Sequence, residues 1–415
     1  MKLMPLDQGR RVRTAAFSLL PALFIACGTD SPSQPRDRSP AALAIEGGSG
    51  QTAVVATSTG ARPTVRITDE SGAGVANIRV TFTVTAGNGW VTDATVTSDA
   101  AGHAATTWYL GPAPATTQTL RASAAGFSAD FSATATPLVA GVRYTGVNSY
   151  VEFIAGDMAV IISAPHGGTL QPSSIPDRSA AGATVIRDAN TDDLALAMRS
   201  AFESSTGGTP HIAVMHLHRS KVDANRDIGE AAEGNRAAEH AWREYHGFIE
   251  AARHHVATQY DRGLNIDLHG HGHDVQRLEL GYLLTAAQLA GDDASLNDAS
   301  IVQRSSIRAL AESSTATHAQ LLRGPGSLGS MLEAQGYPAV PSSTQPHPGV
   351  DPYFTGGYST ARHGSRDGGT IDAVQIEAHR VGVRDTDANR QAFAAALALV
   401  VESWLDVHYG AALAR

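Results

Sequence analysis

Four apolar runs of the chain end in polar side chains that can do chemistry. The run AVIISAPH ends at His166, IAVMHLHR at Arg219, LNIDLH at His269 and DAVQIE at Glu377. In open α/β sheets, ligands bind beyond the carboxyl ends of the strands. If each run is a strand, the four side chains lie around one crevice. One histidine after a strand means little, but four such groups together predict a functional site.

A catalytic zinc site commonly uses two histidines and a carboxylate and keeps one coordination position open. His166 and His269 supply the two nitrogen ligands of such a site. The chain has a single cysteine, which excludes an internal disulfide and any site built from several thiolates. The third ligand is therefore expected to be a carboxylate in the segment RDANTDDLA, residues 187–195. His271 and His273 are interpreted as neighbours of the site or solvated groups rather than as further ligands.

Three aspartates of that segment compete for the role of ligand. Asn190 or Thr191 is expected to cap a helix. Asp192 and Asp193 then fall in its first turn, where the helix dipole favours acidic residues. Asp188 has no such structural role. We therefore favour Asp188 as the ligand, with Asp192 as the alternative.

Strand-like and helix-like stretches alternate from about residue 140 to the end of the chain. This alternation predicts an α/β domain with a largely parallel sheet over residues 140–415. Large apolar residues recur at helical spacing in three places, around Met198, Trp242 and Leu397. These residues are expected to lie in the core rather than on a binding face.

Residues 41–137 consist instead of short alternating runs separated by Gly, Asp and Asn. In IRVTFTV, at residues 78–84, apolar and polar side chains alternate, which predicts a half-buried antiparallel strand. Turn signals recur at the spacing of a β-sandwich, and about 97 residues suit one all-β, immunoglobulin-like unit. Asp69, Asp93 and Asp99 are interpreted as turn and edge residues rather than as metal ligands. The other predicted strands cover residues 65–69, 90–98, 104–110, 119–124 and 130–136.

The N-terminus has the features of an export signal. Lys2 and three arginines precede an apolar stretch, residues 14–26, which is shorter than the about 20 residues that span a bilayer. The sequence LFIAC resembles the lipobox of bacterial lipoproteins, in which the cysteine, here Cys27, is lipidated. We expect a lipoprotein signal peptide over residues 1–27 and a disordered tether over residues 28–40. The chain would then be exported to the bacterial cell envelope and held at a membrane by its lipid; an ordinary signal peptide is the alternative.

Composition argues against one class of partner. The chain has 415 residues, with 40 acidic and 31 basic side chains and a formal net charge of −9. This balance argues against a nucleic-acid-binding protein. The length suggests two or three domains, in line with the boundaries above.

The β-rich segment resembles a known family. The order TDESGAGVANIRVTFTVTAGNG, TSDAAGHAATTWYLG and FSATATP is similar to that of bacterial immunoglobulin-like group 1 domains, the Big-1 or invasin type. The resemblance covers nearly all of residues 41–137. It implies a surface spacer or an adhesive module with contacts at the cell surface.

Six motifs follow in a fixed order in the α/β segment: SAPHGG, RDANTDDLA, RSKVDANR, DLHGHGH, GGYSTARHGS and VQIEAHR. This order resembles that of the N-formylglutamate amidohydrolase family, which is similar in fold and site to the zinc carboxypeptidases. The resemblance covers most of residues 150–408 and implies one zinc ion held by His166, Asp188 and His269. One departure is that carboxypeptidases place the acidic ligand three residues after the first histidine, where this chain has Thr169.

The same resemblance implies roles for other residues. Glu377 corresponds to the base that activates water, and Arg219 to the arginine that polarises the scissile carbonyl. Asn225 and Arg226 correspond to the pair that holds a substrate carboxylate. Tyr358 lies 19 residues before Glu377 in a glycine-rich loop, roughly as a carboxypeptidase lid tyrosine does. Simple loop packing is an equally good interpretation of that tyrosine.

Together these groups predict amide hydrolysis. Zinc lowers the pKa of bound water to about 7, a carboxylate moves the proton to the leaving amine, and arginines hold an oxyanion and a carboxylate. The expected substrate is an N-acyl or N-formyl amino acid, or a peptide, whose amide lies next to a free carboxylate. Two alternatives stay open: a carboxypeptidase acting on cell-wall peptides, and a surface-binding protein without turnover that recognises an anionic ligand.

Overall fold

The computed structural model describes residues 38–410 of the chain. Cys27, the expected signal peptide and most of the expected tether lie outside the described residues.

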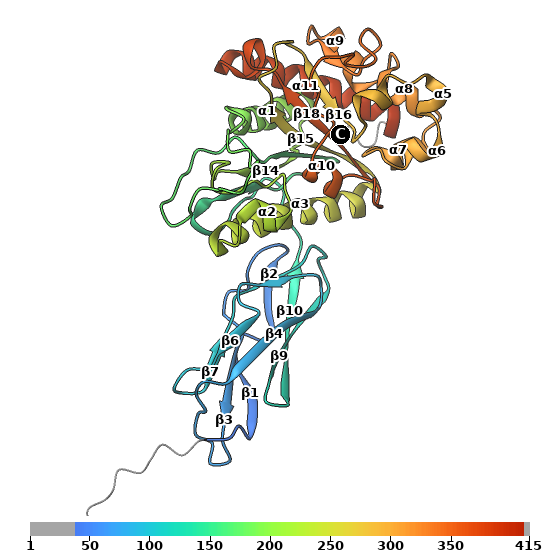
Figure 1. Ribbon diagram of the computed structural model, residues 1–415. Helices are drawn as coiled ribbons and strands as arrows, with labels where there is room; N and C mark the ends of the chain where they lie inside the picture. Colours follow the sequence, from blue (N-terminus) through green and yellow to red (C-terminus); the bar gives the residue numbers. More distant parts are fainter. Residues whose placement is uncertain (1–37, 411–415) are drawn as a thin grey trace, which may run out of the picture. The chain divides into compact units, whose positions relative to one another are not determined.

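Residues 42–136 form the β-rich part, coloured blue to green in Figure 1. Its strands are β1 (Ala42–Gly47), β2 (Gln51–Val54), β3 (Thr64–Thr68), β4 (Arg79–Ala86), β5 (Trp90–Val91), β6 (Thr95–Thr97), β7 (His103–Ala105), β8 (Trp108–Tyr109), β9 (Thr117–Ala124) and β10 (Phe127–Thr136). They form a five-stranded sheet ordered β2-β10-β9-β4-β6, a three-stranded sheet β1-β3-β7 and a ribbon β5-β8. All these pairings are antiparallel except that of β2 with β10.

The alternation predicted for residues 78–84 is confirmed in β4. Val80 and Phe82 are 0% and 2% exposed, whereas Thr81 and Thr83 face solvent. The run predicted at 90–98 is interrupted and forms β5 and β6, and the run at 104–110 forms β7 and β8. We did not predict β1 and β2, because their Ala- and Gly-rich sequence lacks a clear alternation.

Asp69 and Asp99 serve turns, as expected. Oδ1 of Asp69 accepts the N–H groups of Ser71 and Ala73, at 2.9 and 3.0 Å. Oδ1 of Asp99 accepts the N–H groups of Ala101 and His103, both at 2.9 Å. Side chains used in this way stabilise tight turns and need no metal to explain them.

The α/β part contains one eight-stranded sheet, ordered β11-β12-β14-β13-β15-β18-β16-β17. Its strands are β11 (Arg143–Thr145), β12 (Val151–Ile154), β13 (Val160–Ala164), β14 (His211–Met215), β15 (Gly263–Gly270), β16 (Leu278–Gly281), β17 (Ala339–Val340) and β18 (Ile371–Ala378). Its helices are α1 (Thr191–Thr206), α2 (Ile228–Ala232), α3 (Arg236–Tyr260), α4 (Ala286–Leu289), α5 (Asp293–Leu296), α6 (Ala299–Val302), α7 (Arg308–Ser313), α8 (His318–Arg323), α9 (Leu328–Ala334), α10 (Tyr358–His363) and α11 (Asp387–Tyr409), with short turns η1 (Val147–Ser149) and η2 (Arg380–Arg384).

The sheet is mixed, so the prediction of a largely parallel sheet was correct for its centre and for the edge pair of β16 with β17 but not for the other edges. Strands β14, β13, β15 and β18 run parallel to one another. At the edges, β11 pairs antiparallel with β12, β12 with β14, and β16 with β18. The connection between β11 and β12 is a short turn over residues 146–150, and only antiparallel neighbours can be joined so briefly.

Three long helices cover the two faces of the sheet, with α1 and α11 on one face and α3 on the other (Figure 1). The helical spacing around Met198 is confirmed, because Leu194, Met198 and Phe202 of α1 are all 0% exposed. Among the described helices, α11 alone is long and apolar enough by composition to cross a bilayer, with a mean hydropathy of 1.3. Its apolar side chains pack with those of α1 in the core, which is the ordinary place for such a helix.

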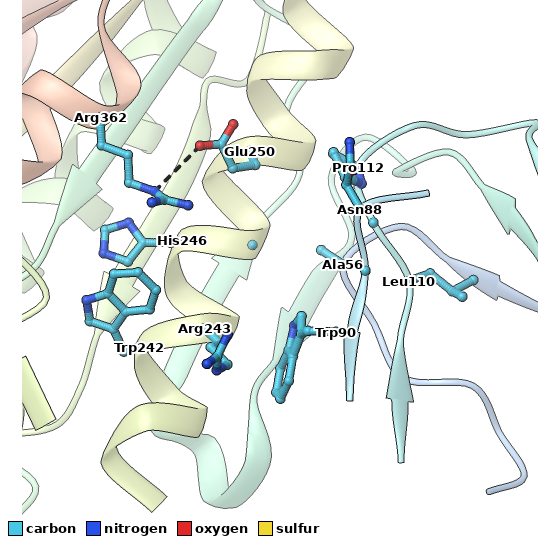
Figure 2. Close-up of a pocket in the computed structure, with 13 residues that line it drawn as sticks. Ala56, Asn88, Trp90, Leu110, Pro112, Trp242, Arg243, His246, Glu250 and Arg362 are labelled. Atoms are coloured by element: carbon cyan, nitrogen blue, oxygen red, sulfur yellow. Dashed lines mark ion pairs between the residues drawn. The ribbon is translucent and has the colours of Figure 1, made fainter. Parts of the chain in front are cut away.

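Helix α3 presents a row of large side chains on one face. Trp242, His246 and Glu250 follow one another at helical spacing, and Arg362 of α10 reaches Glu250 with Nε 3.7 Å from Oε1 (Figure 2). The helix is capped by Asn235, whose Oδ1 accepts two backbone N–H groups at 3.0 and 3.1 Å. This row connects α3 to α10, which precedes the strand that carries Glu377.

Candidate metal centre and active site

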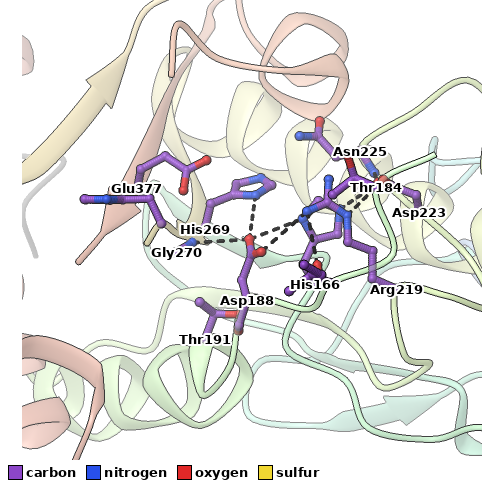
Figure 3. A network of polar contacts seen from close by, with 12 residues as sticks. His166, Thr184, Asp188, Thr191, Arg219, Asp223, Asn225, His269, Gly270 and Glu377 are labelled. Atoms are coloured by element: carbon purple, nitrogen blue, oxygen red, sulfur yellow. Dashed lines mark hydrogen bonds and ion pairs between the residues drawn. The ribbon is translucent and has the colours of Figure 1, made fainter. Parts of the chain in front are cut away.

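The four central strands bring their polar side chains to one edge of the sheet. His166 lies two residues after β13, and Arg219 follows β14. His269 and Glu377 lie near the ends of β15 and β18 and are direct partners across the two strands. Because parallel strands share a carboxyl end, the four residues gather there, as Figure 3 shows.

Asp188 lies between the two histidines. Its Oδ2 is 3.3 Å from Nδ1 of His166 and 3.2 Å from Nδ1 of His269. The three ligand atoms lie within 4.8 Å of one another, and the residues are 0%, 8% and 2% exposed in chain order. The N–H of Gly270 donates to the same Oδ2 at 3.2 Å. Two imidazole nitrogens and a carboxylate oxygen are the donor set of a catalytic zinc site.

The turn before α1 positions Asp188. Its N–H donates to the carbonyl of His166 at 3.0 Å, and its own carbonyl accepts the hydroxyl of Thr191 at 2.9 Å. Asp192 and Asp193 occupy the first turn of α1, as expected from the sequence. Asp192 is not a member of the three-residue cluster, so the geometry favours Asp188 over this alternative.

A buried carboxylate faces the other nitrogen of each histidine. Nε2 of His166 makes a hydrogen bond of 2.6 Å with Oδ1 of Asp223, whereas Nε2 of His269 lies 3.2 Å from Oδ2 of Asp267 in an ion-pair contact without hydrogen-bond geometry. Both carboxylates are 0% exposed. Such partners fix the ring orientation and make the imidazole a stronger ligand. Both Nδ1 atoms are thereby directed at Asp188.

Arg219 contacts both acidic partners of His166. Its Nε donates to Oδ2 of Asp223 at 3.0 Å, and its Nη1 is 3.5 Å from Oδ1 of Asp188. Within the described residues, Nη2 of Arg219 makes no hydrogen bond. Sequence reasoning gave no role to Asp223, although it stands four residues after Arg219 in the motif RSKVDANR.

The electrostatics of the cluster favour positive charge between the carboxylates. Burial alone would raise the pKa of Asp188, but the imidazoles of His166 and His269 hold the pKa of that carboxyl well below its ordinary value. At Asp223, too, the interaction with His166 outweighs the effect of burial and lowers the pKa of the Asp223 carboxyl. Burial would lower the pKa of His269, but Asp267 and Asp188 raise it well above its ordinary value. A divalent cation would supply this positive charge directly.

Glu377 lies beside the cluster without being one of its three members. It is 4% exposed, and the side-chain amide of Gln375 donates to its Oε1 at 2.9 Å. Burial, with the charges of Asp188 and Glu279, raises the pKa of Glu377 to about 8, against the opposing effect of His269. A carboxyl with a pKa near neutrality is suited to take up and return a proton.

Asn225 and Arg226 are engaged elsewhere in this structure. Oδ1 of Asn225 accepts the N–H of Ser359 at 2.8 Å, in the first turn of α10. Nε of Arg226 donates to Glu230 at 2.9 Å, and its Nη1 donates to the carbonyl of Asn225 at 2.8 Å. None of these hydrogen bonds reaches His166, Asp188 or His269, so the substrate-binding role of Asn225 and Arg226 stays a prediction.

Tyr358 is the first residue of α10 and packs against α3. Its hydroxyl accepts a hydrogen bond from Arg362 at 3.1 Å, and its ring centroid lies 6.1 Å from that of Trp242 and 5.7 Å from that of His246. These contacts favour the interpretation as loop packing. The role as a lid stays a prediction.

Arg384 is a site residue that sequence reasoning missed. It is 5% exposed and donates to three carbonyls, those of Ala378, Ala189 and His271, at 2.9, 2.6 and 2.8 Å. These carbonyls belong to the segments that follow Glu377, Asp188 and β15. A Cβ at Gly270 would meet the guanidinium at 2.5 Å, so the glycine gives Arg384 its space.

No protein-family model and no curated protein matches the chain. Among solved structures it is similar to N-formylglutamate amidohydrolase from Ralstonia eutropha JMP134, with 13% identity, a TM-score of 0.39, and coverage of 62% of this chain and 96% of that one. It is similar to a fragment of intimin, solved with the intimin-binding domain of its translocated receptor, at 19% identity and a TM-score of 0.20, covering 30% and 43%. It is also similar to invasin, a bacterial integrin-binding protein, at 19% identity and a TM-score of 0.18, covering 29% and 22%. The chain spans less than half of the last two, and at these identities the similarity concerns the fold alone.

Proposed function

We propose that the α/β part is a zinc-dependent amidohydrolase that cleaves an amide next to a free carboxylate. The observation that carries the proposal is the convergence of Nδ1 of His166, Nδ1 of His269 and Oδ2 of Asp188, with a buried carboxylate against the far side of each ring. A purely structural ion-pair network has no need to direct two imidazole nitrogens at one carboxylate oxygen. The residues present therefore fit a catalytic zinc ion.

When bound, zinc lowers the pKa of water to about 7 and polarises the amide carbonyl. Glu377 then serves as the general base and acid. Its carboxylate accepts a proton from water and returns it to the leaving nitrogen, which its raised pKa supports. The hydrogen bond from Gln375 fixes one of its oxygens and leaves the other for this exchange.

Arg219 supplies a second positive group beside the ligands. Its side chain is 12% exposed, and its Nε and Nη1 are held by Asp223 and Asp188. This anchoring leaves Nη2 to donate to the oxyanion as it develops on the substrate carbonyl. A positively charged donor held in place in a buried site stabilises such an oxyanion strongly.

The substrate class follows from charge and from the expected location of the chain. Arg226, in the segment after Arg219, can grip a carboxylate with two hydrogen bonds once Glu230 releases it. An N-acyl or N-formyl amino acid, or a peptide with a free carboxylate, meets this requirement. The proposed lipid anchor at Cys27 would place the substrate outside the cytoplasm, with the β-rich part as spacer or adhesive module.

The experiment that tests the proposal compares two neighbouring aspartates. The metal content of the untagged chain is measured together with turnover of a panel of N-formyl, N-acyl and dipeptide substrates that carry free carboxylates. We expect Asp188→Asn to lower the zinc content by one ion per chain and to abolish turnover. The matched control, Asp192→Asn, is expected to keep the zinc content and the turnover of the unmodified chain. Turnover that persists in the presence of a metal chelator would contradict the metal mechanism. Zinc bound with no turnover of any substrate would favour the binding protein that has no catalytic activity.

A further inference from the structure

A second group of metal-ligating side chains lies close to the first along the chain. His271 and His273 follow β15, two and four residues after His269, and Glu279 is the second residue of β16. One ligand atom of each of the three residues lies within 4.8 Å of the others. None of the three is a proposed ligand of the first ion or the proposed base, although the charge of Glu279 contributes to the raised pKa of Glu377.

The hydrogen bonds of His271 fix which of its nitrogens carries a proton. Nε2 of His271 is 2.8 Å from the carbonyl oxygen of Arg277, which can only accept, so Nε2 is the protonated nitrogen. Nδ1 therefore carries the in-plane electron pair, which accepts the N–H of His273 at 3.1 Å in this structure. Histidines that bind metals commonly donate their other N–H to a backbone carbonyl in this way. His271 is 3% exposed, and an ion bound through its Nδ1 would displace the hydrogen bond from the N–H of His273.

His273 and Glu279 are oriented just as firmly. Nδ1 of His273 is 2.8 Å from Oε1 of Glu279, and the His273 ring stacks on Phe354 with centroids 4.8 Å apart. The N–H of Phe354 donates to Oε2 of Glu279 at 2.8 Å, which leaves Oε1 for a ligand. Glu279 is buried, whereas the side chain of His273 is 22% exposed and gives an ion access from solvent.

Charge supports a cation at this position. Glu279 pairs directly with Glu377 between β16 and β18, so two buried carboxylates stand side by side on one face of the sheet. When both carboxyl groups are ionised, they are like charges directly opposite each other, which destabilises a sheet. A cation bound by Glu279 would offset this repulsion.

We propose that Nδ1 of His271, Nδ1 of His273 and Oε1 of Glu279 bind a second divalent transition-metal ion. Two imidazoles and a carboxylate suit zinc or a metal of similar preference. The ion takes the place of the proton between His273 and Glu279, and that proton moves to Nε2 of His273. The site stands on its own ligands and does not depend on the proposed hydrolysis.

The test is a zinc titration of the full, untagged chain after metal removal, read by equilibrium dialysis and elemental analysis. We expect two tightly bound ions in the unmodified chain, one in His273→Ala, one in Asp188→Asn and none in the double variant. His347→Ala, which removes another partly buried histidine of the α/β part, is the matched control and is expected to keep two ions.

The outcomes separate this site from the first one. A single ion that is lost with Asp188→Asn and unaffected by His273→Ala would overturn the second site. An ion lost with His273→Ala but retained in Asp188→Asn would uphold it and contradict the first ligand set. If His273→Ala does not fold, a cobalt(II) titration of the unmodified chain decides. Two successive equivalents with distinct visible spectra support the second site, and saturation after one equivalent overturns it.

Discussion

The β-rich part and the α/β part bury different kinds of side chain. Among residues 42–136, the buried polar side chains are all uncharged: Thr59, Ser98, Thr106 and Gln118. In the α/β part, carboxylates and imidazoles are buried together at one end of four strands. Removing a charge from water costs several kcal/mol unless it is closely paired. Stability does not require such a cluster, so the contrast shows where the chemistry of the molecule lies.

This contrast separates two classes of variant. Changes in the β-rich core are expected to reduce stability and leave the site chemistry intact. Changes in the buried polar cluster are expected to alter metal binding, turnover or the pH dependence of stability. Four experiments test this division.

The largest effect is expected for Glu377→Gln. Loss of the proposed base is expected to reduce kcat by about 10²- to 10⁴-fold, because general acid–base catalysis contributes that much. The zinc content is expected to stay unchanged, because Glu377 is not a ligand in the proposed site. Turnover and metal content are measured on the same preparation, with exposed Glu312→Gln as control. A variant that also lost the ion of the first site would show that Glu377 has been given the wrong role.

Phe82→Ala tests the β-rich part. Phe82 is 2% exposed in β4, and removing a buried phenylalanine costs about 3–5 kcal/mol. We expect the free energy of unfolding of this part to fall by that amount in denaturant unfolding followed by tryptophan fluorescence, to which Trp90 and Trp108 contribute. The kcat of the α/β part should stay within about twofold well below the transition, because Phe82 is not a member of the buried polar cluster. An equal loss of turnover would break the division between the two parts.

Asp372→Asn tests a buried carboxyl of the α/β part that lies outside the metal cluster. Burial raises the pKa of Asp372 to about 6, against hydrogen bonds from Ser365 and Tyr409. A carboxyl with a raised pKa in the folded state stabilises the fold fully below about pH 4, and this contribution is lost as the pH rises through about 6. The difference is on the order of 3 kcal/mol. Denaturant titrations of the unmodified chain should show the free energy of unfolding fall by this amount between about pH 4 and 6, and Asp372→Asn should lack that fall. The same pH dependence in the variant would refute the raised pKa of Asp372.

The smallest of the four effects is expected for Asp223→Asn. An amide still fills the space beside His166 but no longer makes its ring a stronger ligand. Partners of this kind commonly contribute 10- to 100-fold to metal affinity. Competition with a chelating dye should show this loss for the ion of the first site. The substitution of the exposed Asp367, Asp367→Asn, is the control. Equal metal affinity in the two variants would show that Asp223 does not strengthen the ligand His166.

Local sequence patterns were enough to predict several elements and the three residues that the structure brings together as a possible metal site. Buried strand runs and helical spacing are short-range signals, and they placed β13, β15, β18 and α1. The preference for Asp188 over Asp192 came from the first turn of one helix. The antiparallel edges were missed because strand order depends on the turn between β11 and β12 and on long-range pairing.

The residues that sequence reasoning missed act over long distances along the chain. Asp223 meets His166 from 57 residues away, and Arg384 reaches Ala189 from 195 residues away. The contact of Asn225 with Ser359, 134 residues later, was likewise not predicted, although Asn225 itself was singled out for another role. No local pattern reports such contacts, because they exist only once the sheet has brought the loops together.

Arg384 limits how the site can evolve. Its three carbonyl contacts tie together the loops that follow Asp188, Glu377 and β15, and Gly270 keeps the space that its guanidinium needs. A substitution that moves one of these loops is expected to move the others. The proposed ligand Asp188 and the proposed base Glu377 therefore cannot change position independently. Substitutions that change the specificity must therefore keep the three hydrogen bonds of Arg384 or replace them together.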